Sequence, residues 1–195
     1  MDSQADEDGT GAARAVVLED RRGSGDQPPA VWTRQDAEPV VGQLYDVVVP
    51  AWDLALERAT AVSVVLVEID WFDRYRQRYG DAVAEACLVE VASAAARTVP
   101  EREDAGLFRY DTHRLALVLP GTDRSVARQS ALALTAEIAA RRYEHAATRS
   151  GLVTLSVGVA AAVPAREGDP VDLVLRADAA LFTARESGHD RVECS

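Results

Sequence analysis

The residues best suited to chemistry lie in a short connection between two apolar segments. Residues 111–114 (Asp-Thr-His-Arg) separate the apolar segments 107–110 and 115–119. His113 and Arg114 place an imidazole beside a permanently charged guanidinium, and such a pair can hold an anion. The alternative is an ordinary surface hairpin in which both side chains are solvated. Both interpretations require that the flanking segments form two strands joined by a tight connection.

The hydrophobic pattern predicts alternating strands and helices along most of the chain. Short, nearly continuous apolar runs rich in β-branched residues predict buried strands, and apolar residues at helical spacing predict helices. The predicted strands are 61–69, 107–110, 115–119, 152–160 and a short edge strand at 191–193. The predicted helices are 34–59, 81–97, 123–143 and 169–186. Pro50 is expected to break or restart the first helix, because proline cannot donate the backbone hydrogen bond.

The order strand-helix-strand-strand-helix-strand-helix is typical of an α+β fold with a ferredoxin-like βαββαβ core. It predicts a central mixed sheet, antiparallel at the hairpin, with helices packed on one face. The domain itself is expected to span 61–195 and to follow an N-terminal helical segment at 34–60. Residues 1–33 are rich in Asp, Gly, Gln, Arg and Pro, and are expected to form a disordered acidic tail.

The composition excludes several classes of function. The net charge of −11 argues against a protein that coats nucleic acid, because nothing would neutralise the phosphates. Cys87 and Cys194 are too few for a disulfide framework or a zinc knuckle, which favours a reducing compartment. No apolar run reaches the ~20 residues of a membrane span, and no signal-peptide pattern starts the sequence. We therefore expect a cytoplasmic protein without a nucleic-acid or membrane partner.

Four stretches, in matching order and spacing, resemble a known family. They are the strand ending in Glu68-Ile69-Asp70-Trp71-Phe72, the hairpin exit Leu119-Pro120-Gly121-Thr122-Asp123, the strand at 153–160 and the segment 176–192. On these residues, the chain from about 46 to 192 resembles a GGDEF domain, the catalytic module of diguanylate cyclases. The resemblance implies a palm-type fold and metal-assisted condensation of two GTP molecules into cyclic di-GMP. The signature Gly-Gly-Asp-Glu-Phe is replaced by Asp-Thr-His-Arg-Leu at 111–115.

The resemblance implies metal ligands at the strand end and at the third signature position. Glu68 and Asp70 are the metal-ligand candidates at the strand end, since Mg²⁺ prefers carboxylate oxygens. His113 and Arg114 replace the two signature carboxylates and put positive charge where the metal would bind. We therefore expect no cofactor and no cyclase activity, with Mg²⁺ bound only if residual nucleotide binding survives. Thr112 replaces a glycine and, being β-branched, would tolerate a left-handed turn poorly.

The nucleotide-contacting positions of the family are altered as well. The resemblance places Arg76 and Glu85 at the guanine-recognition positions, where arginine can only donate but Glu85 could still accept. The resemblance places the family's phosphate contacts at Arg185 and His189. The chain contains no lysine. The alternative for each position is a solvated surface residue. The full set of candidate nucleotide-binding residues is Arg76, Glu85, Asp111, His113, Arg114, Arg185 and His189.

The inhibitory product site of the family is an Arg-x-x-Asp box just before the signature hairpin. Arg102 is in register with that arginine, whereas Asp104 is displaced by one residue. Arg102 could hold part of a dinucleotide through bidentate hydrogen bonds, and the alternative is a charged loop. Three residues have simpler expectations. Trp71 and Phe72 should pack under the end of the sheet, and His145 should lie in a polar loop without a special role.

Three functions are compatible with these residues. The first is a catalytically inactive regulator of bacterial cyclic di-GMP signalling that acts by protein–protein contact, with a protein partner or as a homodimer. Its candidate interface is the segment 34–48, where the family carries signalling helices. The second is a non-catalytic sensor of cyclic di-GMP or GTP, which would use Arg102, Arg114, Arg185 and Glu85. The third is an active cyclase with unusual metal ligands.

Overall fold

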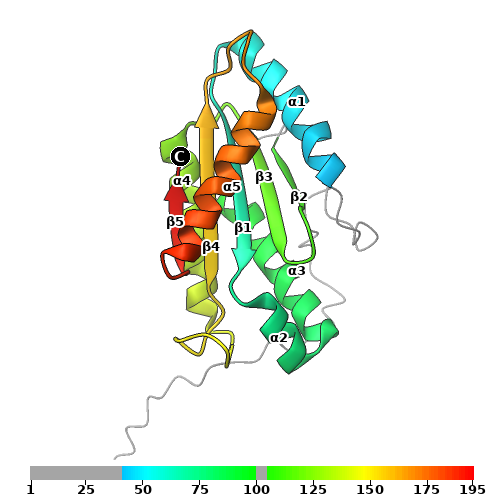
Figure 1. Cartoon of the computed structure of the whole chain (residues 1–195), viewed down its shortest axis with the longest axis vertical. Helices are drawn as coiled ribbons and strands as arrows, with labels where there is room; N and C mark the ends of the chain where they lie inside the picture. The colour runs from blue at the N-terminus through cyan, green and yellow to red at the C-terminus, as the bar shows by residue number, and fades with distance from the viewer. Residues whose placement is uncertain (1–40, 100–104) are drawn as a thin grey trace, which may run out of the picture.

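The computed structural model of the protein describes residues 41–99 and 105–195 (Figure 1). The expectations for the acidic tail at 1–33, for the start of the N-terminal helical segment, and for Arg102 and Asp104 lie outside the described residues. Within them, no helix is long and apolar enough to cross a membrane. Cys87 is buried, Cys194 is partly buried, and both are free thiols.

Helices and strands alternate in the described part of the chain much as the hydrophobic pattern predicts. The helices are α1 (Val41–Arg58), α2 (Phe72–Tyr79), α3 (Asp81–Thr98), α4 (Arg124–Arg141) and α5 (Pro170–Glu186). The strands are β1 (Val62–Ile69), β2 (Gly106–Arg109), β3 (Arg114–Pro120), β4 (Leu155–Ala162) and β5 (Arg191–Cys194). Aspartate side chains cap two of the helices: Asp123 accepts a hydrogen bond from Val126 N, and Asp169 accepts one from Val171 N.

The strands form one mixed sheet in the order β2-β3-β1-β4-β5. Strand β1 lies in the centre and is antiparallel to both β3 and β4, whereas β5 runs parallel to β4 at the edge. This arrangement confirms the predicted α+β fold with a ferredoxin-like core. In this register Glu68 on β1 lies between Arg114 on β3 and Ser156 on β4, so the end of β1 brings three separate segments together.

Helices cover both faces of the sheet, so the expectation of helices on one face is wrong. One core cluster joins the sheet to α2, α3 and α4, and a second cluster on the opposite face joins it to α1 and α5 (Figure 1). The reason lies in β1, where every residue from Val62 to Ile69 is buried. Successive side chains of a strand point to opposite faces, so a strand buried throughout requires cover on both sides.

Helix α1 continues through Pro50, contrary to the expected break. The core holds it on both sides of the proline, through Val48 before it and Trp52 and Ala55 after it. Pro50 itself is exposed, and so is Asp46, whose carbonyl loses its helical donor. Water can replace that hydrogen bond on the solvent side, so packing of the inner face decides the conformation.

Helix α5 lies unusually close to β4 because of one glycine. A Cβ atom on Gly158 would lie 2.2 Å from the carbonyl oxygen of Ala177 and 2.3 Å from the backbone nitrogen of Leu181. Real Cβ atoms do not approach backbone atoms so closely, so the residue at this position must lack a side chain. This contact sets the distance of α5 from the sheet and hence the position of Arg185 near its C-terminal end.

Candidate functional site

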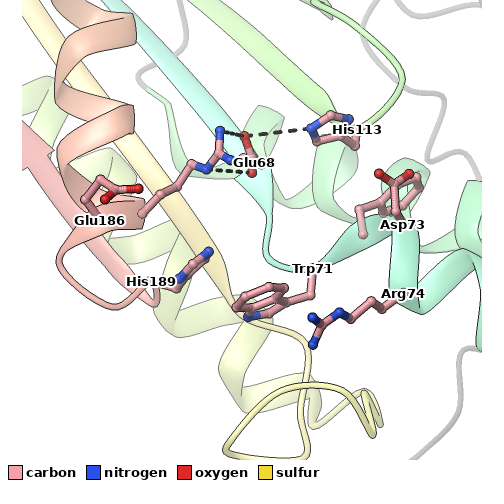
Figure 2. Close-up of a pocket in the computed structure, with 9 residues that line it drawn as sticks. Glu68, Trp71, Asp73, Arg74, His113, Glu186 and His189 are labelled. Atoms are coloured by element: carbon pink, nitrogen blue, oxygen red, sulfur yellow. Dashed lines mark hydrogen bonds and ion pairs between the residues drawn. The ribbon is translucent and has the colours of Figure 1, made fainter.

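A pocket of about 430 Å³ opens where the C-terminal end of β1 meets α2, the tip of the β2–β3 hairpin and the end of α5 (Figure 2). Its lining is rich in charged and ring-bearing side chains. The lining residues are Glu68, Trp71, Phe72, Asp73, Arg74, His113, Arg185, Glu186 and His189. Four of the candidate metal- and nucleotide-binding residues therefore come together here: Glu68, His113, Arg185 and His189.

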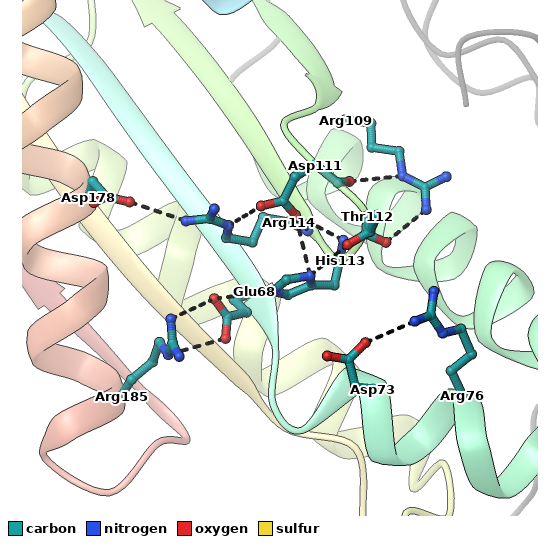
Figure 3. A network of polar contacts seen from close by, with 10 residues as sticks. All are labelled: Glu68, Asp73, Arg76, Arg109, Asp111, Thr112, His113, Arg114, Asp178 and Arg185. Atoms are coloured by element: carbon teal, nitrogen blue, oxygen red, sulfur yellow. Dashed lines mark hydrogen bonds and ion pairs between the residues drawn. The ribbon is translucent and has the colours of Figure 1, made fainter. Parts of the chain in front are cut away.

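Glu68 lies at the centre of this pocket and is only 5% exposed. Its carboxylate pairs with the Arg185 guanidinium from α5, with Nε 3.3 Å from Oε1 and Nη1 3.5 Å from Oε2. Nε2 of His113 approaches the same carboxylate from the hairpin, 3.8 Å from Oε2 (Figures 2 and 3). The acidic group at the end of β1 is thus faced by two groups from its own chain.

The ionisation of Glu68 is set by two opposing effects. Burial raises the pKa of the Glu68 carboxyl above its ordinary value, because the charged form loses hydration. The charge of Arg185 and, when protonated, that of His113 act against this rise, and Arg114 adds to their effect. The net effect is a raised pKa of Glu68, so the charged form of this carboxyl group is less favoured in the pocket than in water.

The hairpin tip is built without glycine and without a left-handed residue. Asp111 and Thr112 are absent from the described residues with positive φ, so the strain expected at Thr112 does not arise. The Asp111 side chain instead closes the turn, because its Oδ1 accepts hydrogen bonds from the backbone N–H groups of His113 and Arg114, at 3.0 and 2.9 Å. Asp111 is therefore a turn-forming residue.

The pKa of the Asp111 carboxyl follows from these contacts. Burial alone would raise it, but the backbone hydrogen bond from His113 and the charges of His113 and Arg114 outweigh burial. The pKa of Asp111 therefore lies below its ordinary value.

Arg109 holds the tip from the other side. Its Nε and Nη2 donate to the backbone oxygens of Asp111 and Thr112, at 2.9 and 2.8 Å, and its Nη1 lies 3.0 and 3.1 Å from the two carboxylate oxygens of Glu85 on α3. Only 10% of the Arg109 side chain is exposed. Glu85, a candidate guanine acceptor, is consequently occupied by an arginine of its own chain and does not line the pocket.

Arg114 and His113 do not act together, although they are adjacent in sequence. Arg114 turns toward α5, where its Nη1 lies 3.2 Å from Oδ1 of Asp178 (Figure 3). Its guanidinium also lies over the Tyr110 ring, 4.9 Å from the ring centroid. It also pairs with Asp111. His113 lines the pocket, whereas Arg114 is absent from the lining. The described geometry therefore does not join the two as an anion-holding pair.

Arg76, the other candidate at a guanine-recognition position, is also used locally. Its Nη2 lies 3.1 Å from Oδ1 of Asp73, and its Nε lies 3.9 Å from Oδ1 of Asp81. It does not line the pocket. Both residues that the resemblance placed against guanine, Arg76 and Glu85, are thus paired within the chain.

Asp70 is buried completely and is saturated by donors from the protein. Its carboxylate accepts hydrogen bonds from Thr154 Oγ1 and Ser156 Oγ, each at 2.6 Å, and from Asp190 N at 3.1 Å. These contacts join the end of β1 to the start of β4 and to the turn before β5. The side chain does not line the pocket, so this geometry assigns Asp70 a structural role.

His145 packs behind Asp70 and is fully buried. The sequence predicted only a polar loop here, so the burial was not expected. Its Nδ1 accepts from Ala147 N at 3.4 Å, so Nε2–H is the group that donates to the carbonyl of Asp70, at 3.1 Å. The Tyr75 ring meets it edge-on at 4.9 Å. Burial lowers the pKa of His145, in keeping with a neutral ring that uses both nitrogens.

Trp71 lies at the mouth of the pocket, and the expectation that it packs under the sheet is wrong. It is 41% exposed and has φ of 57°, whereas Phe72 is buried as predicted. The Trp71 ring stacks on His189 at 4.8 Å, and the Arg74 guanidinium lies 4.5 Å from its centroid. No sequence signal distinguishes Trp71 from Phe72, because the left-handed backbone at Trp71 decides which of the two turns outward.

The described residues do not fit the metal site that the resemblance implies. Glu68 is paired with Arg185, the Asp70 oxygens are occupied by protein donors, and His113 stands where a carboxylate would be needed. No group of three or more His, Cys, Asp or Glu side chains in the described ranges is arranged to hold a metal ion. Mg²⁺ requires several oxygen ligands in near-octahedral geometry, and this pocket does not supply them.

Comparison with known proteins agrees with the fold. Residues 43–191 match the family model described as "Diguanylate cyclase, GGDEF domain". The chain therefore belongs to the GGDEF domain family. It is 31% identical over 146 residues to the response regulator PleD of Caulobacter vibrioides and 26% identical over 139 residues to diguanylate cyclase A of Treponema denticola. These matches cover 72% and 71% of the chain but only 31% and 36% of the relatives, so it spans about a third of their length.

Solved structures share the fold. The GGDEF domain of DgcB from Caulobacter crescentus, in complex with c-di-GMP, superposes with a TM-score of 0.70 at 22% identity, over 84% of this chain and 98% of that domain. The diguanylate cyclase SiaD of Pseudomonas aeruginosa, in complex with its activator SiaC, also gives a TM-score of 0.70, at 20% identity, over 86% of this chain and 63% of SiaD. At such identities the likeness concerns the fold.

Proposed function

We propose that the chain is a catalytically inactive GGDEF-domain protein of bacterial cyclic di-GMP signalling that acts by protein–protein contact. The observation that carries this proposal is the ion pair between Glu68 and Arg185. A carboxylate that would serve a metal ion is neutralised by an arginine and faced by a histidine. A cation arriving in the pocket would have to displace Arg185 and to bind beside its charge.

The guanine side of the site supports the same proposal. Arg109 occupies both carboxylate oxygens of Glu85, and Asp73 and Asp81 pair with Arg76. A nucleotide base would therefore have to break existing pairs on both sides before making its own hydrogen bonds. The Arg109–Glu85 pair is the stronger obstacle because its arginine is largely buried, whereas each exposed Arg76 pair is worth less than about 0.5 kcal/mol, so the balance disfavours binding mainly at Glu85.

Protein contact is the mode of action that the fold leaves intact. The core and the surface helices are complete in the described ranges, while the metal-binding and base-binding positions are altered together. One GGDEF protein with the same fold, SiaD, was solved in complex with an activator protein. We place this chain in the cytoplasm, in keeping with its two free thiols.

A second candidate function is a sensor that binds cyclic di-GMP or GTP without turnover. The observation that favours it is the pocket of about 430 Å³, which retains Arg185 and His189 in its lining. Phosphate oxygens could compete with Glu68 for the Arg185 guanidinium. The GGDEF domain of DgcB was solved with c-di-GMP, which makes that ligand the first to test.

Two measurements on the full chain test these proposals. Incubation with labelled GTP and either Mg²⁺ or Mn²⁺, at high protein concentration, should give no cyclic dinucleotide, while an active GGDEF domain in the same buffers gives product. Formation of cyclic di-GMP would overturn the proposal of inactivity. Calorimetric titration with cyclic di-GMP, and separately with GTP and Mg²⁺, should give no heat of binding. Saturable heat that disappears in Arg185→Ala would favour the sensor instead.

A further inference from the structure

The exposed side of α2 carries two arginines that lie over aromatic rings. Arg74 and Arg78 are four residues apart, so they lie one helical turn apart on the same side of the helix. The Arg74 guanidinium lies 4.5 Å from the centroid of the Trp71 ring, and that of Arg78 lies 6.0 Å from the centroid of the Tyr79 ring. Both arginines are exposed. These four residues form the α2 arginine face.

The two guanidinium groups of this face have no carboxylate of their own. Within the described part of the chain, no carboxylate forms an ion pair with Arg74 or Arg78. The third arginine of the helix, Arg76, differs, because it pairs with Asp73 and Asp81. Contact with a ring fixes the plane of a guanidinium and leaves its N–H edge free to donate to a carboxylate. The α2 arginine face is therefore prepared for two carboxylates about one helical turn apart.

The sequence contains one acidic segment that matches this spacing. Residues 6–8 (Asp-Glu-Asp) are the only run of three consecutive acidic residues in the chain, and no arginine lies closer to them than Arg14. In an extended segment, the side chains of Asp6 and Asp8 would point to the same side and lie about 6.6 Å apart. Residues four apart on a helix are separated by about 6 Å along its axis. The two carboxylates therefore match the two arginines in charge and in spacing.

We propose that residues 6–8 bind the α2 arginine face of their own chain, with Asp6 and Asp8 each paired with one of the two arginines. The described structure begins at Val41, and 32 residues lie between Asp8 and Val41. A segment of that length spans about 100 Å when extended, whereas a domain of this size is roughly 40 Å across. The connection is therefore long enough to reach α2 from any point on the domain.

Two surface ion pairs select the same chain over a separate molecule. Each exposed pair is weak, so the contact would not hold two separate proteins together at ordinary concentrations. A segment tethered to the domain is present at an effective concentration of about a millimolar, which compensates for that weakness. Partner proteins with a stronger acidic segment would compete with residues 6–8 for the α2 arginine face.

The contact would change the charge at the mouth of the pocket. Trp71 and Arg74 belong both to the α2 arginine face and to the lining of the pocket (Figure 2). Residues 6–8 would neutralise Arg74 and add negative charge beside the opening, which would repel an anionic ligand. This inference goes beyond the proposed function, because it holds whether or not the chain forms cyclic di-GMP.

The absence of lysine from the chain allows a direct test. In the full chain, Arg78→Lys supplies the only side-chain amine, and a carbodiimide joins such an amine through an amide bond to a carboxylate that it contacts. Peptide mass spectrometry should locate a cross-link on residues 6–8. Arg166→Lys is the matched control, because Arg166 is also exposed but lies between β4 and α5. We expect at least tenfold less cross-linking to residues 6–8 in the control.

Equal yields in the two variants would overturn the inference. A mixture of ¹⁵N-labelled and unlabelled Arg78→Lys chains should give cross-links within one chain, and a cross-link between labelled and unlabelled peptides would assign the contact to a second copy instead. Sodium chloride at 0.5 M shortens the Debye length to about 4 Å and should lower the yield several-fold. A yield that does not respond to salt would contradict the ion pairs. Cyclase activity would refute the proposed function and leave this contact unaffected.

Discussion

Nε of Arg185 on α5 lies 3.3 Å from Oε1 of Glu68 on β1, although the two residues are 117 positions apart in the chain. The pair fixes the end of α5 to the centre of the sheet at the floor of the pocket. Glu68 is buried and Arg185 is partly exposed, so the pair is intermediate between a surface ion pair and a buried one.

A double-mutant cycle should measure this coupling. With Glu68→Gln, Arg185→Gln and the double variant, urea unfolding at pH 7 should give a coupling free energy of about 1 kcal/mol. The exposed pair Arg76–Asp73 is the matched control, with an expected coupling below about 0.5 kcal/mol. Equal coupling in both cycles would mean that Arg185 does not hold the Glu68 carboxylate in solution.

Gly158→Ala should destabilise the protein by about 3 kcal/mol or more, because the new methyl group would meet rigid backbone atoms of α5. Gly80→Ala is the control: its Cβ would meet nothing within 4 Å, although φ of 88° disfavours alanine. We expect it to cost about 1 kcal/mol. Denaturant unfolding of both variants provides the comparison, and similar losses would contradict the close approach of α5 to β4.

Asp111→Ala should cost about 2 kcal/mol, since two backbone N–H groups at the hairpin tip lose their acceptor. Asp111→Asn keeps an acceptor oxygen and should cost less. The folded-state pKa of Asp111 is lowered, so its charge stabilises the fold above the unfolded value of 3.8 and this contribution is lost as the pH falls below it. The difference between wild type and Asp111→Asn should therefore narrow in unfolding curves recorded below pH 3.8; a constant difference would contradict the assignment.

His145 should make stability fall as the medium becomes mildly acidic. Burial lowers the folded-state pKa below the unfolded value of 6.5, so below pH 6.5 the unfolded chain takes up a proton that the folded chain resists. His145→Gln keeps a donor for the carbonyl of Asp70 but cannot be protonated. Thermal unfolding between pH 7.5 and 5.5 should be less pH-dependent in this variant. A pH dependence in this variant equal to that of wild type would contradict the assignment.

Much of the fold could be predicted from the sequence, because local patterns determine it. The nearly continuous apolar run of β1, the helices that begin after Asp123 and Asp169 and the hairpin each depend on neighbouring residues. Two expectations failed for a non-local reason. Pro50 does not end α1, since the core holds the helix on both sides of it, and helices cover both faces because β1 is buried throughout.

The site was less predictable, because its contacts join distant segments. The sequence indicated that Glu68 and Arg185 are altered nucleotide-site positions, but not that they pair with each other. It gave no sign that Arg114 turns toward Asp178 while His113 takes the pocket side, because Asp178 lies 64 positions away in the chain. Left-handed backbone at Trp71 and His189 places their rings in contact, and such conformations in non-glycine residues have no sequence signature here.

The contacts of Asp70 have a consequence for how the protein folds. This carboxylate joins residues 84, 86 and 120 positions away, which makes it one of the least local groups in the chain. Contacts that close such long loops form late in folding. A partly folded chain would therefore contain helices and a hairpin but no pocket. Any small molecule that binds the pocket would act as a selective stabiliser of the fully folded chain, raising its melting temperature and its yield in the cell.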